Sequence, residues 1–419
     1  MRVVMIRVGR QPPTVKGEVM AHATTHASRA LTALSVLLAS FGPQAAFCAG
    51  ATGIDAASQG PDSVEGFKGH DYSMVAQFHR RHGLRRPSSG VTQAADGLFY
   101  GVTADFEKRV NLGGVYRTNE SGDITILHAF QGTSEDPGYP QGELVQASDG
   151  NLYGLTLTSL YRVSPSGDYA VVHLFDPARE GWDFLSGPVQ GANGLLYLVA
   201  RDGSLHNRGG ILTSTLDGSV QVLHAFKEGR DGFAPQAGLA LGDDGNLYGT
   251  TTQGGALERG TFYRISLDGS FELLATIDPT MCKGPRTRLV LYNGDFYGVC
   301  PGGGSHASGS IVRFTQQGVA EKLHDFGRGE DGGQPWGGLV VDPSTGELFG
   351  TTLGGGTAEY GTVFEISFDG TEYKKLLDFD LPRSVYPQGD LLLSQDGFIY
   401  GTSSQGGRKG GGTVYRFHP

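Results

Sequence analysis

Beyond about residue 90 the chain consists of short runs in which apolar and polar residues alternate, separated by clusters of glycine, aspartate and asparagine. In Thr261–Ser266 (Thr-Phe-Tyr-Arg-Ile-Ser) this alternation suits a strand whose two faces pack against different neighbours. Pairs such as Asp244-Gly245 favour tight hairpin turns, because these residues tolerate a positive φ. The pattern therefore predicts an all-β protein built from many short strands.

One unit recurs along the chain, an Asp-Gly or Asn-Gly type of turn followed by an aromatic-glycine step. The aromatic residues of the successive copies stand about fifty residues apart, which is the period of a four-stranded propeller blade. They are Tyr100, Tyr153, Tyr197, Tyr248, Tyr297, Phe349 and Tyr400. We therefore predict one domain over residues 71–419, a seven-bladed β-propeller of four-stranded antiparallel blades.

The copy around Tyr248 shows the predicted blade best, with strands at Gly238–Leu241, Asn246–Thr251, Thr261–Ser266 and Phe271–Ile277. The fourth strand has a signature such as Leu223-His224-Ala225-Phe226, which follows all the aromatic-glycine steps except the last. The missing copy, Val75-Ala76-Gln77-Phe78, lies at the other end of the chain. We predict that a strand at about Tyr72–His79 completes the last blade, because an open ring would leave an unpaired edge strand.

The Tyr-Gly-Thr-Thr, Gly-Gly, Gly-Thr-Val-Phe and Leu-His-Ala-Phe elements resemble the tandem-repeat families named GloVer and HAF extracellular repeats. The resemblance runs over about residues 71–419. The copy at Tyr153 departs from it by lacking the Gly-Gly loop, and the copy at Tyr197 has Leu198-Val199-Ala200 in place of Gly-Thr-Thr. The resemblance implies an exported bacterial protein, and it supplies no catalytic residues.

The first fifty residues differ from the rest. Their apolar run, Ala30–Phe41, is too short to span a bilayer and is followed by the small residues Ala49-Gly50-Ala51. We expect residues 1–51 to be a signal-peptide region, with Met20 as the hypothetical true start, and residues 52–70 to be a flexible leader. The protein would then be secreted or periplasmic. Lipidation at Cys48 is an alternative that the sequence leaves open.

Two cysteines remain in the predicted propeller, Cys282 and Cys300. An oxidising compartment would let them pair, and antiparallel strands could bring them near each other. A disulfide and two free, partly buried thiols both fit the sequence.

Glycine accounts for 68 of 419 residues, roughly twice its usual share, which fits many turns between short strands. The net charge of −10 gives no basic footprint for nucleic acid and disfavours anionic membranes. We expect no nucleic-acid partner, no stable membrane insertion and a monomer. The sequence contains no phosphate loop, nucleophile elbow or metal-binding motif, so it predicts no catalytic residue, cofactor or metal.

Four histidines share one position on the fourth strands of different blades, where they lie too far apart to bind one metal ion. They are His128, His173, His224 and His324. We expect them to hydrogen-bond the backbone of a neighbouring blade.

Long loops, between second and third strands and between blades, share one face, and ligands favour such loops. The candidate ligand-binding residues on this face are Tyr139, Trp182, Phe233, Trp336, Tyr386, Asp136, Asp231 and Asp331. Rings that stack and acids that accept hydroxyls would suit a sugar. The alternative is that the aromatic residues belong to repeat-specific turns and wedge between blades.

Two functions follow from these features. The first is a binding or interaction module for an extracellular ligand, either a glycan or a protein. The second is a lyase or lactonase acting at the mouth of the central channel, which rests on analogy of fold. First strands such as Glu143–Gln146 and Asp390–Leu393 are mostly apolar or small, with Arg286 and Arg288 as exceptions. This composition favours binding over catalysis.

Overall fold

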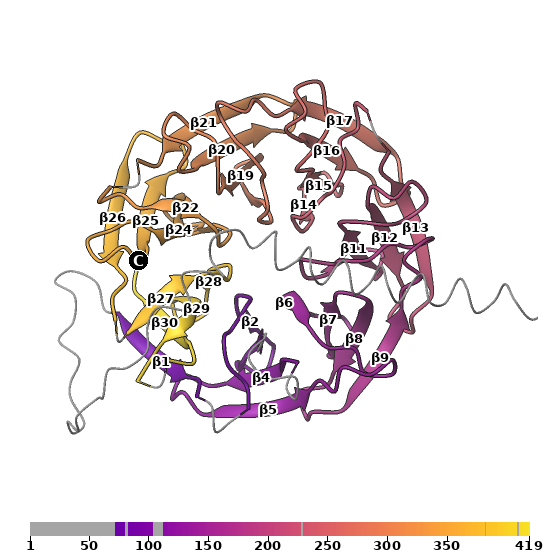
Figure 1. Ribbon diagram of the computed structural model, residues 1–419, viewed down its shortest axis with the longest axis horizontal. Coiled ribbons are helices and arrows are strands. Elements are labelled where there is room, and N and C mark those ends of the chain that lie inside the picture. The colour runs from indigo at the N-terminus through magenta and orange to yellow at the C-terminus, as the bar shows by residue number, and fades with distance from the viewer. Residues whose placement is uncertain are drawn as a thin grey trace, which may run out of the picture. The chain divides into compact units, whose positions relative to one another are not determined.

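The computed structural model describes residues 72–79, 83–103, 112–227, 229–327, 329–381, 383–408 and 410–419. These residues form seven antiparallel sheets arranged in a ring, which confirms the predicted propeller (Figure 1). Within these ranges no helix is long and apolar enough to cross a membrane. The predicted signal region, the leader and Cys48 lie outside the described residues.

The first four blades each contain four strands that pair in chain order. Blade 1 contains β2 (Thr92–Gln93), β3 (Phe99–Thr103), β4 (Gly114–Thr118) and β5 (Ile124–Ala129). Blade 2 contains β6 (Pro140–Gln146), β7 (Leu152–Thr156), β8 (Ser159–Val163) and β9 (Tyr169–Leu174). Blade 3 contains β10 (Val189–Gln190), β11 (Leu196–Ala200), β12 (Gly210–Ser214) and β13 (Val220–Ala225). Blade 4 contains β14 (Ala240–Leu241), β15 (Leu247–Thr250), β16 (Thr261–Ile265) and β17 (Phe271–Thr276).

In the last three blades the same meander recurs, but the innermost strand of blades 6 and 7 is divided in two. Blade 5 contains β18 (Val290–Tyr292), β19 (Asp295–Cys300), β20 (Ser310–Thr315) and β21 (Ala320–Asp325). Blade 6 contains β22 (Gly333–Pro335), β23 (Val340–Val341), β24 (Glu347–Gly354), β25 (Thr362–Ser367) and β26 (Tyr373–Asp378). Blade 7 contains β27 (Ser384–Pro387), β28 (Leu392–Leu393), β29 (Ile399–Gly406), β30 (Thr413–Phe417) and β1 (Ser73–Gln77).

The ring is closed by the N-terminal strand, as predicted. β1 pairs antiparallel with β30 and forms the outer strand of blade 7 (Figure 1). The Tyr72 hydroxyl donates to Ser384 Oγ at 2.7 Å. Phe78 is fully buried. Its ring packs edge to face with that of Tyr116 in blade 1, with the ring centres 4.8 Å apart. Chain closure thus contributes both a sheet edge and core packing.

The repeated turn has the same physical role in blades 1, 2, 4 and 7. In blade 4, Asp244 accepts the backbone N–H of Asn246 at 3.0 Å and the hydroxyl of Tyr248 at 2.9 Å, and Gly245 has a φ of 77°. The same acid–tyrosine bond recurs at Asp96–Tyr100, Asp149–Tyr153 and Asp396–Tyr400. The acid four residues before the tyrosine therefore fastens the hairpin to the strand that follows it.

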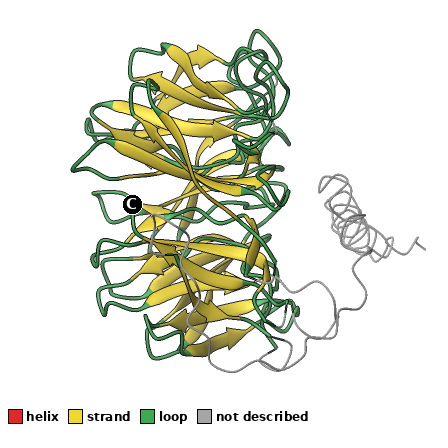
Figure 2. Cartoon of the chain, turned by 90° about the vertical axis from the view of Figure 1, so that its left-hand side faces the viewer, coloured by secondary structure: helices red, strands yellow, loops and turns green. Residues whose placement is uncertain are grey.

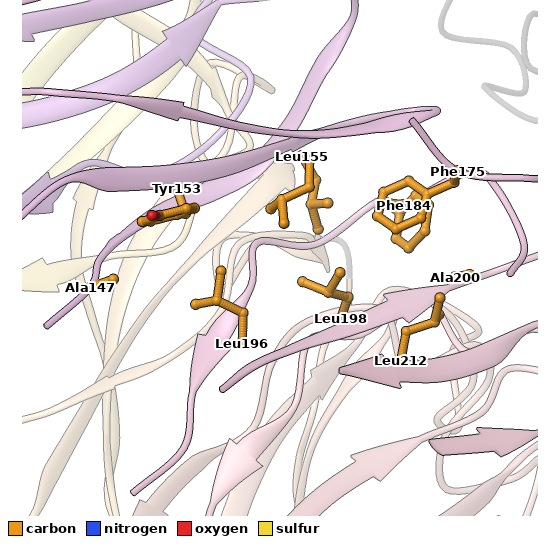
Figure 3. Close-up of a cluster of buried hydrophobic side chains, with 10 residues drawn as sticks. Ala147, Tyr153, Leu155, Phe175, Phe184, Leu196, Leu198, Ala200 and Leu212 are labelled. Carbon is orange, nitrogen blue, oxygen red and sulfur yellow. The ribbon is translucent and has the colours of Figure 1, made fainter. Parts of the chain in front are cut away.

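The glycine of the aromatic-glycine step makes room for a ring on the third strand. A Cβ atom on Gly249 would clash with the hydroxyl of Tyr263. The same pairing recurs at Gly101 with Tyr116, Gly154 with Tyr161, and Gly401 with Tyr415. Side chains between adjacent blades then form the core, as Figure 3 shows for Leu155, Leu196 and Leu198 beside the Phe175–Phe184 pair.

The innermost strands are interrupted by a few residues that do not pair with the second strand of the blade. In β6 the pairing with β7 jumps from Gln141 to Val145. Isolated bridges precede the corresponding gaps in four other blades: Pro87↔Thr103, Trp182↔Asp202, Phe233↔Gln253 and Lys283↔Gly302. Each unpaired segment starts near a residue with positive φ, such as Tyr139 at 63° or Tyr386 at 57°. Irregular inner strands of this kind are common beside functional sites.

Candidate functional site

The seven unpaired segments meet around the axis of the ring. Four residues beyond each positive-φ residue stand Gly90, Glu143, Gly187, Gly238, Arg288, Gly338 and Asp390. The glycines allow close approach, since a Cβ atom on Gly187 would clash with the carbonyl of Glu143 and one on Gly90 with that of Asp390. The ring is therefore narrow, and Glu143, Arg288 and Asp390 are the large side chains at this level.

These three side chains line one pocket of about 240 Å³. Its other lining residues come from the innermost strands of blades 1, 2, 3 and 7, so the pocket lies on the channel axis. Figure 1 views the ring down this channel, and Figure 2 shows the loops gathered at the two ends of the strands. The positively and negatively charged groups thus converge where the chain enters the inner strands from the long loops.

Backbone groups hold both carboxylates. The N–H of Gly90 donates to Glu143 Oε1 at 3.1 Å, and the N–H of Gly338 donates to Asp390 Oδ1 at 2.5 Å. Burial and then the charge of Glu143 raise the pKa of Asp390 to about 7, against the opposing effects of Arg288 and the Gly338 N–H. Near neutral pH this carboxyl group is therefore partly protonated, and it can both donate and accept hydrogen bonds.

Two residues before Arg288 and Gly338 on the inner segments stand Arg286 in blade 5 and Trp336 in blade 6, and we call this level the mouth of the channel. The guanidinium of Arg286 lies 5.4 Å from the centre of the Trp336 ring. Arg286 and Arg288 are both exposed to solvent, and Trp336 is half-buried. Desolvation by neighbouring atoms and the charge of Arg201 lower the pKa of Arg286. The mouth therefore combines an apolar ring surface with donors and acceptors of hydrogen bonds.

Trp336 is the predicted aromatic residue that contacts a side chain of this mouth. Arg208 lies over the Phe233 ring at 4.8 Å, and the Tyr386 ring meets the edge of Tyr360 at 5.7 Å. The Trp182 backbone pairs with Asp202, and the Tyr139 N–H donates to the carbonyl of Leu112 at 3.0 Å. These four aromatic residues each belong to a different junction between blades.

The three predicted acids lie beside histidines of the fourth strands, toward the outside of the ring. His128 Nε2 is 3.1 Å from Asp136 Oδ1, and His324 Nε2 is 3.6 Å from Asp331 Oδ2. Asp231 stands near His224, where its charge opposes the effect of burial, which lowers the pKa of that histidine. The structure therefore does not bring these acids to the channel mouth.

The predicted hydrogen bonds from these histidines to the backbone of a neighbouring blade are wrong for two of them. The partner of His128 is Asp136, and the partner of His173 is Glu180 at 2.9 Å. The histidine rings also stack on aromatic rings of the next blade, as His128 does on Tyr169 at 3.5 Å. The signature histidine thus packs blades together through its ring. In the described part of the chain, no group of three or more His, Cys, Asp or Glu is arranged to hold a metal ion.

Comparison with known proteins gives the family. Residues 66–240, 157–342 and 323–419 match the model of the Gloeobacter/Verrucomicrobia repeat. This chain belongs to that repeat family. No curated protein matches it.

Several solved structures share the propeller fold of this Gloeobacter/Verrucomicrobia repeat protein. Two are extracellular domains of proteins described as hybrid two-component systems from B. thetaiotaomicron, with 12% and 11% identity and TM-scores of 0.54 and 0.56. They match over 82% and 84% of this chain but only 39% and 41% of their own, so the chain spans about two fifths of their length. A fungal alcohol oxidase in complex with copper has 13% identity and a TM-score of 0.54, covering 83% of this chain and 75% of its own. At these identities the likeness concerns the fold alone.

A disulfide joins Cys282 and Cys300, whose Cα atoms lie 5.4 Å apart, and both residues are fully buried. Cys282 precedes the segment that carries Arg286 and Arg288, and Cys300 ends β19. The bond therefore fastens the arginine-bearing connection of blade 5 to the sheet behind it.

Sequence reasoning missed Glu143 and Asp390, although it noted Arg288. The signal was present in the repeat itself. Two copies of Tyr-Pro-Gln-Gly, at residues 139–142 and 386–389, are each followed by an acid, where four of the other five copies have glycine. An acidic residue where most other copies have glycine marks a functional position more clearly than the apolar residues that follow it.

Proposed function

We propose that this protein is an exported, non-catalytic binding module that holds a saccharide at the mouth of its central channel. The observation that carries the proposal is the meeting of Glu143, Arg288 and Asp390 in one axial pocket, with Trp336 close to Arg286 at its mouth. Elsewhere at the same level the repeat has glycine, so these charged side chains differ from the scaffold that surrounds them.

The chemistry of this group suits hydroxyl-rich ligands. A carboxylate accepts hydrogen bonds, a guanidinium donates them, and the partly protonated Asp390 does both. The Trp336 ring offers an apolar surface on which a sugar ring can stack. The pocket of about 240 Å³ is smaller than those that enclose drug-sized ligands, so it suits a single sugar unit. The rest of a longer saccharide would lie across the mouth.

Export is the second part of the proposal. Its support is the apolar run of residues 30–41, the Cys282–Cys300 pair and the extracellular domains that share the fold. A monomer is expected. A protein ligand at the same mouth is the alternative outcome of the binding experiment.

A lactonase or lyase is the second candidate function. The observation that favours it is Asp390, a carboxyl group with a raised pKa close enough to Glu143 to respond to its charge, because such pairs supply general acids and bases. Turnover of a lactone or polysaccharide by the purified protein, lost in Asp390→Asn, would favour this candidate over the binding module.

A glycan array followed by calorimetric titration tests the proposal. Asp390→Asn and Trp336→Ala should each weaken binding of the best glycan by about tenfold or more, equivalent to about 1.4 kcal/mol. Asp243→Asn, in an exposed turn, and Trp182→Phe, at another blade junction, are the matched controls and should bind normally. Binding that survives both test variants would contradict the proposal. So would a screen in which only proteins bind.

A further inference from the structure

We infer that the ligand is an acidic saccharide, whose carboxylate or sulfate group binds Arg286 and Arg288 at the channel mouth. The inference rests on the proposed function and adds the chemical class of the ligand. It concerns the two exposed arginines of blade 5 rather than the carboxylates below them.

The two arginines share one short segment. They flank Thr287, where the backbone bends, in the interrupted inner strand; Arg288 lines the axial pocket, and Arg286 lies over the Trp336 ring. At the corresponding positions most other blades have glutamine, serine or leucine in place of Arg286 and glycine in place of Arg288. Two arginines therefore occur on the inner segment of blade 5.

Neither arginine forms an ion pair with a described residue, although Arg288 lies close enough to Asp390 for its charge to act on that carboxyl group. Among the described residues no carboxylate lies within 4.0 Å of Arg286 or Arg288, whereas Arg201 is paired with Asp183 at 2.5 Å. Arg264 and Arg313 likewise form ion pairs, with Glu272 and Glu321. Exposed, unpaired guanidinium groups beside a pocket are available for an anion that comes from outside the chain.

The positive charge of Arg201 near Arg286 also favours an anion at the mouth. Arg286 is partly desolvated and also lies within reach of the positive charge of Arg201, and an anion beside Arg286 would stabilise its charge against both effects. A guanidinium binds carboxylate and sulfate oxygens through paired hydrogen bonds. Trp336 lies beside Arg286, so a sugar ring can stack there while its acidic group meets the arginines.

The two carboxylates of the pocket do not cancel this preference. Glu143 and Asp390 each accept a backbone N–H of a neighbouring blade, and Asp390 is partly protonated near neutral pH. They are therefore suited to the hydroxyl groups of the same ligand. The net charge of −10 acts over longer distances, where physiological salt screens it beyond about 8 Å.

A chemically matched pair of ligands tests the inference. Galacturonate oligomers and the same oligomers after reduction of their carboxyl groups differ only at C6, which carries a carboxylate in one and a neutral hydroxymethyl group in the other. A sulfated oligosaccharide with its desulfated form is the second pair. Calorimetric titration of the full chain should show at least one acidic member binding about tenfold or more tightly than its neutral partner at low salt. High salt should reduce this difference.

Variants of Arg286 and Arg288 test whether these two residues cause the preference for the acidic ligand. Arg286→Gln with Arg288→Gln should abolish the preference for the acidic member. Because Arg288 also lines the saccharide pocket, the neutral member should lose affinity too, but by a smaller factor, so that the two members bind about equally. Arg286→Lys with Arg288→Lys should restore part of it, because the charge returns without the paired geometry. Arg179→Gln removes the same charge at a side chain that is 83% exposed and should have no effect.

The possible results distinguish a failure of the preference for acidic saccharides from a failure of the saccharide site itself. Equal or tighter binding of the neutral members in both pairs overturns the inference and leaves the proposed saccharide site intact. Failure of every acidic and neutral saccharide to bind overturns both. A preference for acid that persists in the double glutamine variant also overturns the inference.

Discussion

Asp390 connects the stability of the protein to its candidate site. Its pKa rises from an ordinary 3.8 to about 7 in the folded state. The folded protein therefore holds this proton more tightly than the unfolded chain does, and this contribution to stability is fully present only below pH 3.8. It is lost as the pH rises toward 7, and it remains absent above that value. An ionised Asp390 is a destabilising group kept at the mouth of the channel.

Replacing this group should stabilise the protein at neutral and alkaline pH but not at acidic pH. Asp390→Asn should raise the free energy of unfolding at pH 8 by about 1–3 kcal/mol and change it little at pH 4. Thermal unfolding at the two pH values measures the difference, with Asp243→Asn as the control that changes neither. An equal shift at both pH values would show that ionisation of Asp390 is not its cause.

Tyr263 illustrates how a single hydroxyl can be dispensable. Its hydroxyl is buried and has no hydrogen-bond partner among the described residues, and blade 6 has Phe364 at the corresponding position. Tyr263→Phe should therefore leave the free energy of unfolding within about 0.5 kcal/mol of wild type. Tyr248→Phe loses a bond to Asp244 and should cost about 1 kcal/mol. Chemical denaturation measures both, and equal losses would contradict this assignment.

Individual side-chain roles were harder to predict from the sequence than the strands that carry them. The repeat places Glu143 and Asp390 on inner strands, but their meeting at the axis depends on segments that leave their sheets. It places Asp136 on a long loop, but the fold of that loop turns it toward His128. Both outcomes depend on backbone conformations at positive φ, which alternation of apolar and polar residues does not encode.

Among the structural elements, the connection into blade 5 combines the disulfide with the two arginines. The Cys282–Cys300 bond spans 18 residues and lies in the core. Cys282→Ala with Cys300→Ala should lower the free energy of unfolding by about 2–4 kcal/mol. Denaturation with and without a reductant measures this loss, and the reductant should affect wild type but not the double variant. Equal sensitivity of both proteins to the reductant would contradict the structural role of the bond.

The strands themselves could be predicted closely, because each repeat contains the same turn chemistry. In blade 4 the expected second strand, residues 246–251, is found as β15, Leu247–Thr250, and the third and fourth strands also begin where expected. The first strand is much shorter than predicted, because Gly238 and Leu239 lie in the unpaired segment. That segment is where the glycines and charged residues of the channel are found.

For the molecule as a whole, ring closure depends on β1. Its pairing with β30 covers the edge of blade 7, and Phe78 fills the junction with blade 1. A chain that begins at residue 83 should therefore aggregate or melt at a much lower temperature than a chain that begins at residue 71. Light scattering and thermal unfolding compare the two. Identical melting of both chains would contradict closure by the N-terminal strand.

The arrangement of seven blades gives the channel its composition. Seven nearly equivalent segments converge on one axis, so a departure from glycine in only three of them produces an asymmetric site. Binding at this point needs no change in the repeats that build the rest of the ring. In such a scaffold the packed blades stabilise the fold, and residues at the channel mouth bind the ligand.

The location of a bound saccharide decides whether the axial pocket is the binding site. A crystal structure of the protein with the tightest-binding oligosaccharide of the glycan screen should show a sugar unit on the channel axis. This unit should form hydrogen bonds with Glu143, Arg288 and Asp390, and the ligand should also contact Trp336. A saccharide bound at the outer histidine–acid pairs, with the axial pocket holding only water, would contradict it.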